Sequence, residues 1–191
     1  MPTIKEINDS LKLYKAKLFT KKVWFNKGIS FVISLLIVLS LSLPMYFWAI
    51  NTKTPIYDSW FIRINITLNS GVSFGILKGK TLAIIFIQLF SLIMLLIAFF
   101  LVLKWYYSFC ILISLHGAVF NFLDRLIDAN VPSLGIPKQN SVLDYFQFNM
   151  FGTQSAIFNF PDIFILMGII SISLIFLIES FKGKENIKHD I

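Results

Sequence analysis

The chain has 191 residues, of which 57% are hydrophobic and 14% are charged, and its formal net charge is +7. This composition is too apolar for an ordinary soluble domain, so we expect an integral membrane protein. The Lys and Arg residues lie at the ends of apolar runs and in the tails, without a nucleic-acid-binding motif, so membrane lipids are expected partners and nucleic acid is not. The single cysteine, Cys110, can form neither an internal disulfide nor a metal site, and we expect no metal or other cofactor.

The N-terminal segment, residues 1–27, is basic and contains seven lysines. Ile7, Leu11 and Leu18 recur at helical spacing, which predicts an amphipathic helix at the inner membrane surface. This segment is not a cleavable signal peptide, because its basic part and the apolar run that follows are both too long.

Four apolar runs are long enough to cross a bilayer as helices, and they lie at about 28–50, 81–103, 105–124 and 160–178. The second and third are almost contiguous, so they should form a tight antiparallel hairpin. The expected fold class is an all-α integral membrane protein with four transmembrane helices. Its four-span domain covers residues 28–180 and is followed by a basic tail, residues 181–191.

An even number of spans places both termini on the same side of the membrane. If that side is the cytoplasm, it receives the seven N-terminal lysines, Lys104 and the three lysines of the C-terminal tail. This excess agrees with the preference of basic residues for the cytoplasmic side. The polar loops 51–80 and 125–159 would then lie at the outer face.

The first outer loop contains a stretch that alternates between apolar and polar residues. Its apolar members are expected on one face and its polar members on the other: Ile62, Ile64, Ile66 and Leu68, against Arg63, Asn65, Thr67 and Asn69. This period predicts a half-buried strand, a small extracytoplasmic β-element. The segment 69–75 follows, and its glycines allow a tight turn.

Aspartates gather between the third and fourth spans, where four of the ten acidic residues lie: Asp124, Asp128, Asp144 and Asp162. Asp144 and Asp162 could fold together, and two carboxylates in one site share a proton. The ionised member could then activate water while the neutral member donates to a scissile carbonyl, which is aspartic peptidase chemistry. Two simpler interpretations stay open: Asp162 as an acid at a helix start, and Asp144 as an exposed loop acid.

Other polar residues near the same surface have two interpretations each. Asp124 and Arg125 could form an ion pair at the end of a helix, or Arg125 could hold a carbonyl or a neighbouring aspartate. Asn121 and Asn159 could orient substrate groups or satisfy buried polar atoms. His116 is expected to be buried and hydrogen-bonded.

Four short motifs, taken together, resemble those of the prolipoprotein signal peptidases, the signal peptidase II family of bacterial membranes. The family pattern Asn-x-Gly-x-x-Phe is similar to residues 69–74, and Gly-Gly-Ala-x-Gly-Asn-x-x-Asp-Arg is similar to residues 116–125. Val-Val-Asp-Phe is similar to residues 142–145, and Phe-Asn-x-Ala-Asp is similar to residues 158–162. The motifs occur in the family's order, and the resemblance covers about residues 30–180.

The resemblance implies a membrane aspartic endopeptidase with Asp144 and Asp162 as catalytic residues. It implies supporting or substrate-binding roles for Asn69, Gly71, Asn121, Asp124, Arg125 and Asn159. The substrates would be diacylated prolipoproteins, cut before the lipid-modified cysteine. We expect a monomer in the bacterial cell membrane with both termini in the cytoplasm and the active site at the outer face.

The chain departs from the family pattern at several points. His116, Phe120 and Pro161 replace preferred small residues, the first span lacks the family's acid, and residues 126–140 form an insertion. These substitutions are the basis of an alternative, a non-catalytic protein of the same fold that binds lipoproteins without cleaving them. A small transporter or channel subunit is a third interpretation, but it needs ionisable residues near the midplane.

Overall fold

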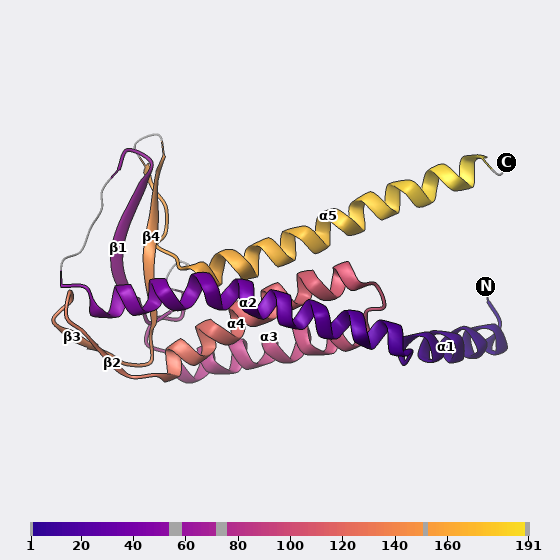
Figure 1. Ribbon diagram of the computed structural model, residues 1–191, viewed down its shortest axis with the longest axis horizontal. Coiled ribbons are helices and arrows are strands. Elements are labelled where there is room, and N and C mark those ends of the chain that lie inside the picture. Colours follow the sequence, from indigo (N-terminus) through magenta and orange to yellow (C-terminus); the bar gives the residue numbers. More distant parts are fainter. Residues whose placement is uncertain (1, 54–58, 72–75, 151–152, 190–191) are drawn as a thin grey trace.

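The computed structural model describes residues 2–53, 59–71, 76–150 and 153–189. Long helices run along one axis, and a small sheet lies across one end of them, opposite the two termini (Figure 1). The helices are α1 (Ile4–Leu18), α2 (Lys21–Asn51), α3 (Thr81–Leu101), α4 (Trp105–Leu126) and α5 (Phe160–His189). The strands are β1 (Ile62–Asn69), β2 (Ala129–Val131), β3 (Ile136–Lys138), β4 (Val142–Met150) and β5 (Thr153–Gln154).

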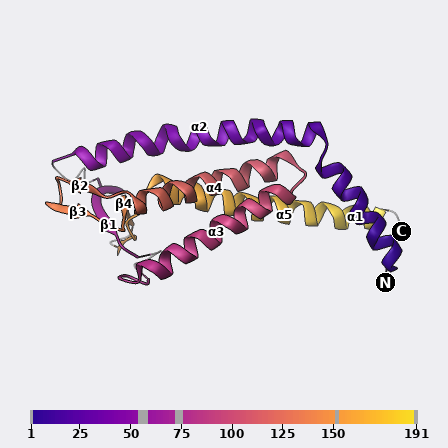
Figure 2. The same ribbon diagram turned by 90° about the horizontal axis from the view of Figure 1, so that it is seen from below.

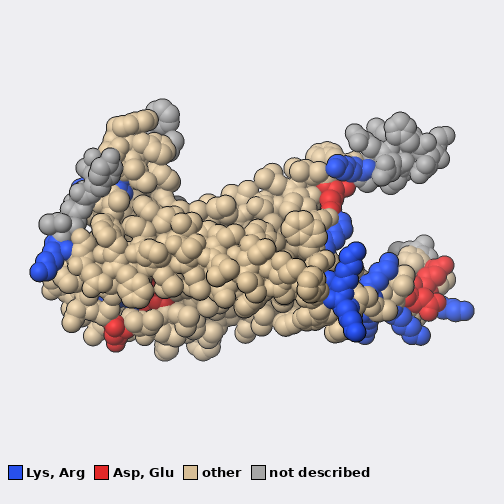
Figure 3. All heavy atoms as spheres, viewed as in Figure 1, with Lys and Arg blue, Asp and Glu red and all other residues tan. Residues whose placement is uncertain are grey.

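Four of these helices are long and apolar enough to cross a membrane: α2, α3, α4 and the part of α5 from Phe160 to Lys182. Charged side chains gather at the two ends of the face drawn in Figure 3, and the surface between them is uncharged. This is the distribution that a bilayer requires. The expected fold class, a mostly helical four-span membrane protein with small β-elements, is confirmed. Helix α2 begins at Lys21 and so includes basic residues that lie before the expected first span.

Helix α4 is the centre of the bundle. Over half of its apolar segment is buried, against about a fifth or less in the other three spans. It contacts α2, α3 and α5, and α2 and α3 lie on either side of it (Figure 2). Gly168 on α5 allows a close approach to α4, because a Cβ there would lie 2.1 Å from Ser114 Oγ and 2.4 Å from the carbonyl oxygen of Cys110. Small residues at such crossings let membrane helices pack closely.

The strand expected from the alternating stretch is β1, and it pairs antiparallel with β4. The expected alternation is wrong, however, because the register shifts between Ile64 and Thr67, where β1 contains one extra residue. Ile64 pairs with Phe146 and Thr67 with Asp144, and directly paired residues share a face. Ile66 and Leu68 therefore lie on the opposite face from Ile64, and Ile66 joins the buried cluster of Ala49, Val131, Leu143 and Tyr145. A β-bulge of this kind redirects side chains, often beside functional sites.

The insertion at residues 126–140 forms a hairpin in which β2 and β3 pair antiparallel. Gly135 lies in its turn with φ +65°, a conformation that glycine adopts without strain. Val131 of β2 packs against Ala49 at the end of α2 and against Leu143 of β4. The hairpin is therefore joined to both the bundle and the sheet.

Helix α1 begins with a capping box, in which the Thr3 side chain and backbone exchange hydrogen bonds with Glu6. Its other end is joined to the bundle, because Leu18 is buried and the Tyr14 hydroxyl donates to the carbonyl oxygen of Leu101. The expected basic helix is therefore present, and Ile4 and Ile7 on it are exposed.

Candidate active site

Backbone pairing brings the two predicted catalytic acids to the same end of the bundle. Asp144 lies in β4, and the segment that leads into α5 forms a bridge with this strand between Phe146 and Phe158. The Phe146 amide donates to the Phe158 carbonyl at 2.8 Å, and the Phe158 amide donates in return at 2.9 Å. Asn159 and the first turn of α5, which carries Asp162, therefore begin beside Asp144.

Asn159 lies between the two acids and contacts both. Its Nδ2 donates to Asp144 Oδ1 at 2.9 Å and to Asn121 Oδ1 at 3.0 Å. Its backbone amide donates to Asp162 Oδ2 at 3.1 Å, and its Oδ1 accepts from the Asp162 amide at 2.9 Å. Asn121 Nδ2 completes the network by donating to Asp162 Oδ1 at 2.7 Å. One asparagine thus joins the two carboxylates and orients both.

The two simpler interpretations of the acids have different outcomes. Asp144 is not an exposed loop acid, because only 2% of it is exposed and it lies within a strand. Asp162 does cap a helix, since its exchange of hydrogen bonds with Asn159 is a capping box at the start of α5. The cap uses Oδ2, whereas Oδ1 accepts from Asn121, so helix capping accounts for only part of its environment.

The bulge in β1 places Asn69 beside Asp144. Because the extra residue reverses the alternation before Thr67, Asn69 shares the face of β4 that carries Asp144. Asn69 Nδ2 donates to Asp144 Oδ2 at 3.0 Å, and Asn69 Oδ1 accepts from the Gly71 amide at 2.9 Å. An uninterrupted strand would point this amide to the other face. The rest of this motif, Val72 to Phe74, and Gly75 after it lie outside the described residues.

Arg125 binds backbone rather than the neighbouring acid. Its guanidinium donates to the carbonyl oxygens of Gly71 at 2.7 Å, Asn140 at 2.9 Å and Asn69 at 3.3 Å. Its Nε donates to Gln88 Oε1 at 3.2 Å. Gln88 lies on α3 and is the one strongly polar side chain of the second apolar run in the sequence. The fork geometry of arginine suits several acceptors at once. Arg125 therefore joins the loop after β1 to the loop before β4.

Asp124 pairs with Lys138, so the predicted ion pair between Asp124 and Arg125 is wrong. Lys138 Nζ lies 3.1 Å from Asp124 Oδ1, and both side chains are buried. Asp124 Oδ2 accepts from the Leu143 amide at 2.7 Å. Sequence reasoning missed Lys138, and the signal for it was a lone basic residue in an insertion that follows an acid at a helix end.

The environment of Asp144 favours its neutral form. Burial, followed by the negative charge of Asp162, raises the pKa of Asp144 to about 8, and Asp124 adds to the rise. The hydrogen bond from Asn69 and the charge of Arg125 act in the opposite direction. A carboxyl that keeps its proton at neutral pH can act as a general acid.

The remaining polar candidates, His116 and Cys110, are buried in helix α4. His116 is buried as expected, and its Nδ1 lies 3.1 Å from Ser34 Oγ, with the Phe31 ring edge-on to the imidazole. Cys110 is a buried free thiol. Within the described part of the chain, no group of three or more His, Cys, Asp or Glu side chains is placed to hold a metal ion.

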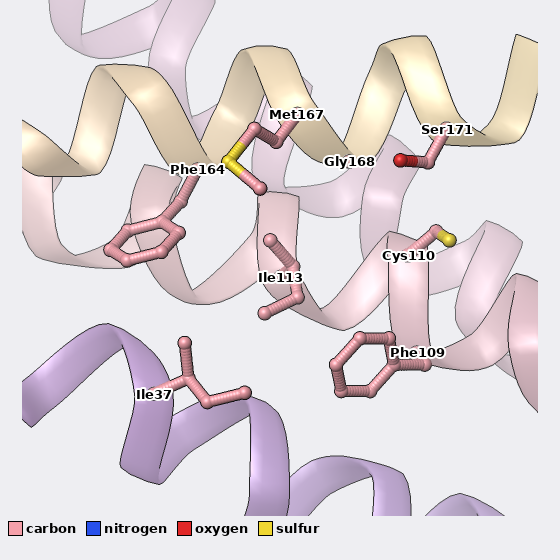
Figure 4. A pocket seen from close by; sticks show the side chains of 8 residues that line it. All are labelled: Ile37, Phe109, Cys110, Ile113, Phe164, Met167, Gly168 and Ser171. Carbon is pink, nitrogen blue, oxygen red and sulfur yellow. The ribbon is translucent and has the colours of Figure 1, made fainter.

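An apolar hollow of about 160 Å³ lies deeper along the helices (Figure 4). Phe164, one of its lining residues, follows Asp162 on α5 by two positions. Helices α2, α4 and α5 supply the lining: Ile37, Phe109, Cys110, Ile113, Phe164, Met167, Gly168 and Ser171. The hollow contains no acid, so it suits hydrocarbon rather than chemistry.

Comparison with known proteins agrees with this geometry. The model of the family described as signal peptidase (SPase) II matches residues 32–178. A lipoprotein signal peptidase of Mycoplasma genitalium is 38% identical over 138 residues, which cover 72% of this chain and 69% of that protein. One from Staphylococcus aureus strain JH9 is 30% identical over 166 residues, which cover 83% of this chain and 93% of that protein.

A solved structure described as a bacterial membrane enzyme, determined by the in meso method at 2.3 Å resolution, has the same fold. Its TM-score is 0.65 at 26% sequence identity, and the match covers 80% of this chain and 90% of that one. A second such structure, at 1.9 Å resolution, gives a TM-score of 0.62 at 27% identity and covers 78% and 93% of the two chains. The chain, matched over most of its length and carrying two acids joined by an asparagine, belongs to the signal peptidase II family.

Proposed function

We propose that the chain is a membrane aspartic endopeptidase that removes the signal peptide from diacylglyceryl-modified prolipoproteins, before the lipid-modified cysteine. The proposal rests on its membership of the signal peptidase II family. The observation that supports Asp144 and Asp162 as the catalytic pair is the single asparagine, Asn159, that hydrogen-bonds to both carboxylates.

The environments of the two acids suggest their roles. Asp144 is the neutral member at pH 7, because its pKa is raised to about 8. It donates its proton to the oxygen of the scissile carbonyl while Asp162 takes a proton from the attacking water. The new C–O bond forms as water adds to the carbonyl carbon. Asp162 then gives its proton to the leaving nitrogen as the C–N bond breaks, and Asp144 recovers its own.

The supporting residues would keep the acids in place during these proton transfers. Asn69 and Asn159 bind the two oxygens of Asp144, and Asn121 binds Asp162. Arg125 binds the carbonyl of Gly71 in the loop after β1 and that of Asn140 in the loop before β4. Its hydrogen bonds therefore hold the two loops together. Asp124 holds the amide next to Asp144. Preorganised contacts of this kind lower the reorganisation that the reaction requires.

The proposed setting is a monomer in the bacterial cell membrane with both termini in the cytoplasm and the acids at the outer face. The excess of lysine at the end that carries the termini supports this orientation. In the proposed arrangement, residues 28–180 form the peptidase domain, residues 1–27 lie at the inner surface, and residues 181–191 form a tail. The acyl chains of the substrate would lie in the bilayer, for which the apolar hollow beyond Phe164 offers a hydrocarbon surface.

The three substituted residues, His116, Phe120 and Pro161, are accommodated within the helices. His116 contacts Ser34 and Phe31, and the Phe120 ring lies edge-on to Tyr46. Pro161 occupies the first turn of α5, whose capping by Asn159 is intact. These contacts favour cleavage over the alternative of binding without cleavage.

The test is processing of a synthetic diacylated prolipoprotein by the purified full chain in detergent or liposomes. Wild type should release the signal peptide, and Asp144→Asn and Asp162→Asn should each reduce turnover by about 10³-fold, a loss typical of a missing general acid or base. Asp128→Asn is the matched control, because Asp128 is an exposed acid of the same segment. Equal turnover in all four proteins would refute the assignment of the catalytic pair.

A further inference from the structure

Lys138 is a fully buried lysine in the insertion that this chain carries. It ends strand β3, and none of its surface is exposed. Its Nζ donates to the carbonyl oxygens of Asp124 and Ile127, the latter at 2.5 Å, and lies 3.1 Å from Asp124 Oδ1. Burying an ammonium group is costly unless partners surround it. Three partners surround this one, so the site is built for a cation.

Asp124 connects Lys138 to strand β4, which carries Asp144. The other oxygen of Asp124, Oδ2, accepts from the Leu143 amide at 2.7 Å, and Leu143 directly precedes Asp144 in β4. The Leu143 carbonyl in turn lies 3.4 Å from Nδ2 of Asn159. Lys138 is therefore two contacts away from Leu143, the residue that precedes the first acid.

Capping of α4 is the simplest role for Lys138, and it explains only part of the geometry. A lysine near a helix C-terminus binds the last carbonyls, as Lys138 does with Asp124 and Ile127. A cap does not require the contact with the Asp124 carboxylate. That contact balances the buried negative charge of Asp124, whose other oxygen accepts from the Leu143 amide of β4.

We propose that Lys138 is a positioning residue for the catalytic pair. It holds the Asp124 carboxylate against the Leu143 amide and so determines the place of Asp144, which makes the insertion 126–140 part of the catalytic apparatus. The proposal rests on the proposed function for its consequence in turnover. Displacement of a reacting group by about 1 Å costs about 10²-fold in rate, and this is the loss that we expect without Lys138.

The first experiment compares wild type with Lys138→Met and with Lys80→Met in prolipoprotein processing. Lys80 is an exposed lysine before α3, so it is the matched control. Lys138→Met should lower kcat by about 10²-fold with little change in KM, because the substrate surface is intact and the acid is displaced. Lys80→Met should behave as wild type. A Lys138→Met variant with the kcat of wild type overturns the proposal.

The second experiment adds Asp124→Asn to Lys138→Met and distinguishes positioning from capping. A neutral amide at position 124 can still accept from the Leu143 amide, and it needs no cation beside it. The double variant should therefore turn over about tenfold faster than Lys138→Met alone, the kind of coupling expected between residues in contact. A cap alone predicts no rescue, and absence of rescue overturns the proposal.

Hydrogen exchange at the Leu143 amide separates this proposal from the proposed function. If wild type does not cleave the substrate, the proposed function fails, and the exchange rate then decides on Lys138. Faster exchange at Leu143 in Lys138→Met than in wild type and Lys80→Met supports the positioning contact. Equal exchange in the three proteins overturns it.

Discussion

The two ends of the helix bundle differ in how deeply their ion pairs are buried. At the end that carries the sheet, which we call the acid end, Asp144, Asp124, Arg125 and Lys138 are each at most 4% exposed. At the end that carries the termini, the lysine end, the ion pair of Lys104 with Glu179 is 2.7 Å long, but its side chains are 53% and 36% exposed. Figure 3 shows the exposed charges at the lysine end. The comparison shows that a short ion-pair distance alone does not indicate a functional site, because the free-energy cost of a charge depends on how deeply it is buried.

Lys27 is the exception at the lysine end, and it sharpens the comparison. It is 1% exposed, and its Nζ donates to the carbonyl oxygens of Phe99 at 2.8 Å and Phe100 at 2.9 Å. These carbonyls belong to the last turn of α3, so the ammonium caps that helix. Trp24 and Phe99 present their rings to it. Its partners are backbone and aromatic groups, whereas those at the acid end include a second titratable side chain.

The largest effect among the supporting residues should follow from Asn159→Ala. The change removes the contacts to both acids and the side-chain cap of α5. We expect a loss of about 10³-fold in turnover, since both members of the proposed general acid–base pair lose their orientation. The control is Asn51→Ala, which removes an exposed amide that bonds to its own helix at the Phe47 carbonyl. Turnover of Asn159→Ala within threefold of the control would contradict a bridging role.

Arg125→Lys tests whether the acid end needs the fork of arginine or only a positive charge. A single ammonium cannot reach the acceptors on Gly71, Asn140 and Gln88 together. Each lost charged hydrogen bond costs about 1.5–3 kcal/mol, so the melting temperature should fall, and turnover should fall by about 10²-fold as the loops shift. Thermal melting and processing assays measure both effects. Unchanged values would mean that charge alone suffices.

The sequence predicted the helices well because their signals are local. Each span is an apolar run of sufficient length, and the two runs joined near Lys104 could only form a hairpin. The faces of β1 could not be predicted in the same way, because the bulge arises from pairing with β4. The sequence from Ile62 to Leu68 alternates without interruption and does not indicate the bulge. The position of Asn69 beside Asp144 depends on that bulge.

The predicted site residues came from motifs, and the structure adds their partners. All eight predicted residues lie at the acid end, within a connected set of hydrogen bonds. The partner of Asp124 had only a weak signal in the sequence, because Lys138 reaches it through an insertion whose hairpin packs against Ala49 and Leu143. Neighbouring opposite charges in a sequence, such as Asp124 and Arg125, point in different directions on a helix.

A smaller effect should distinguish two glycines at the same helix crossing. A Cβ at Gly117 would lie 2.7 Å from the Pro161 carbonyl oxygen, and one at Gly168 would lie 2.4 Å from that of Cys110. Each change to Ala should destabilise the protein by about 1–3 kcal/mol through overpacking. Only Gly117→Ala displaces the turn that carries Asp162. The two variants should therefore have similar melting temperatures, but Gly117→Ala should have the lower turnover. Equal losses of turnover would contradict the distinction.

The smallest effect should come from the lysine end. Lys104→Met removes the exposed ion pair with Glu179, which also accepts from Tyr106 and Tyr107. We expect a change of less than about 1 kcal/mol in stability, since exposed pairs contribute little, and no change in turnover. A denaturant midpoint and a processing assay measure the two quantities. A large loss of stability or of turnover in Lys104→Met would contradict the contrast between the buried ion pair of the acid end and the exposed ion pair of the lysine end.

The central claim is that the acid end contains a buried acid pair that holds a proton at neutral pH. An infrared titration of wild type against Asp144→Asn tests it, because the C=O stretch of a protonated carboxyl is distinct from that of a carboxylate. The account predicts a difference band at pH 7 that disappears as the pH rises through about 8, the value to which the pKa of Asp144 is raised. A difference band that is already lost near pH 4, the ordinary range of an aspartate, would contradict the account.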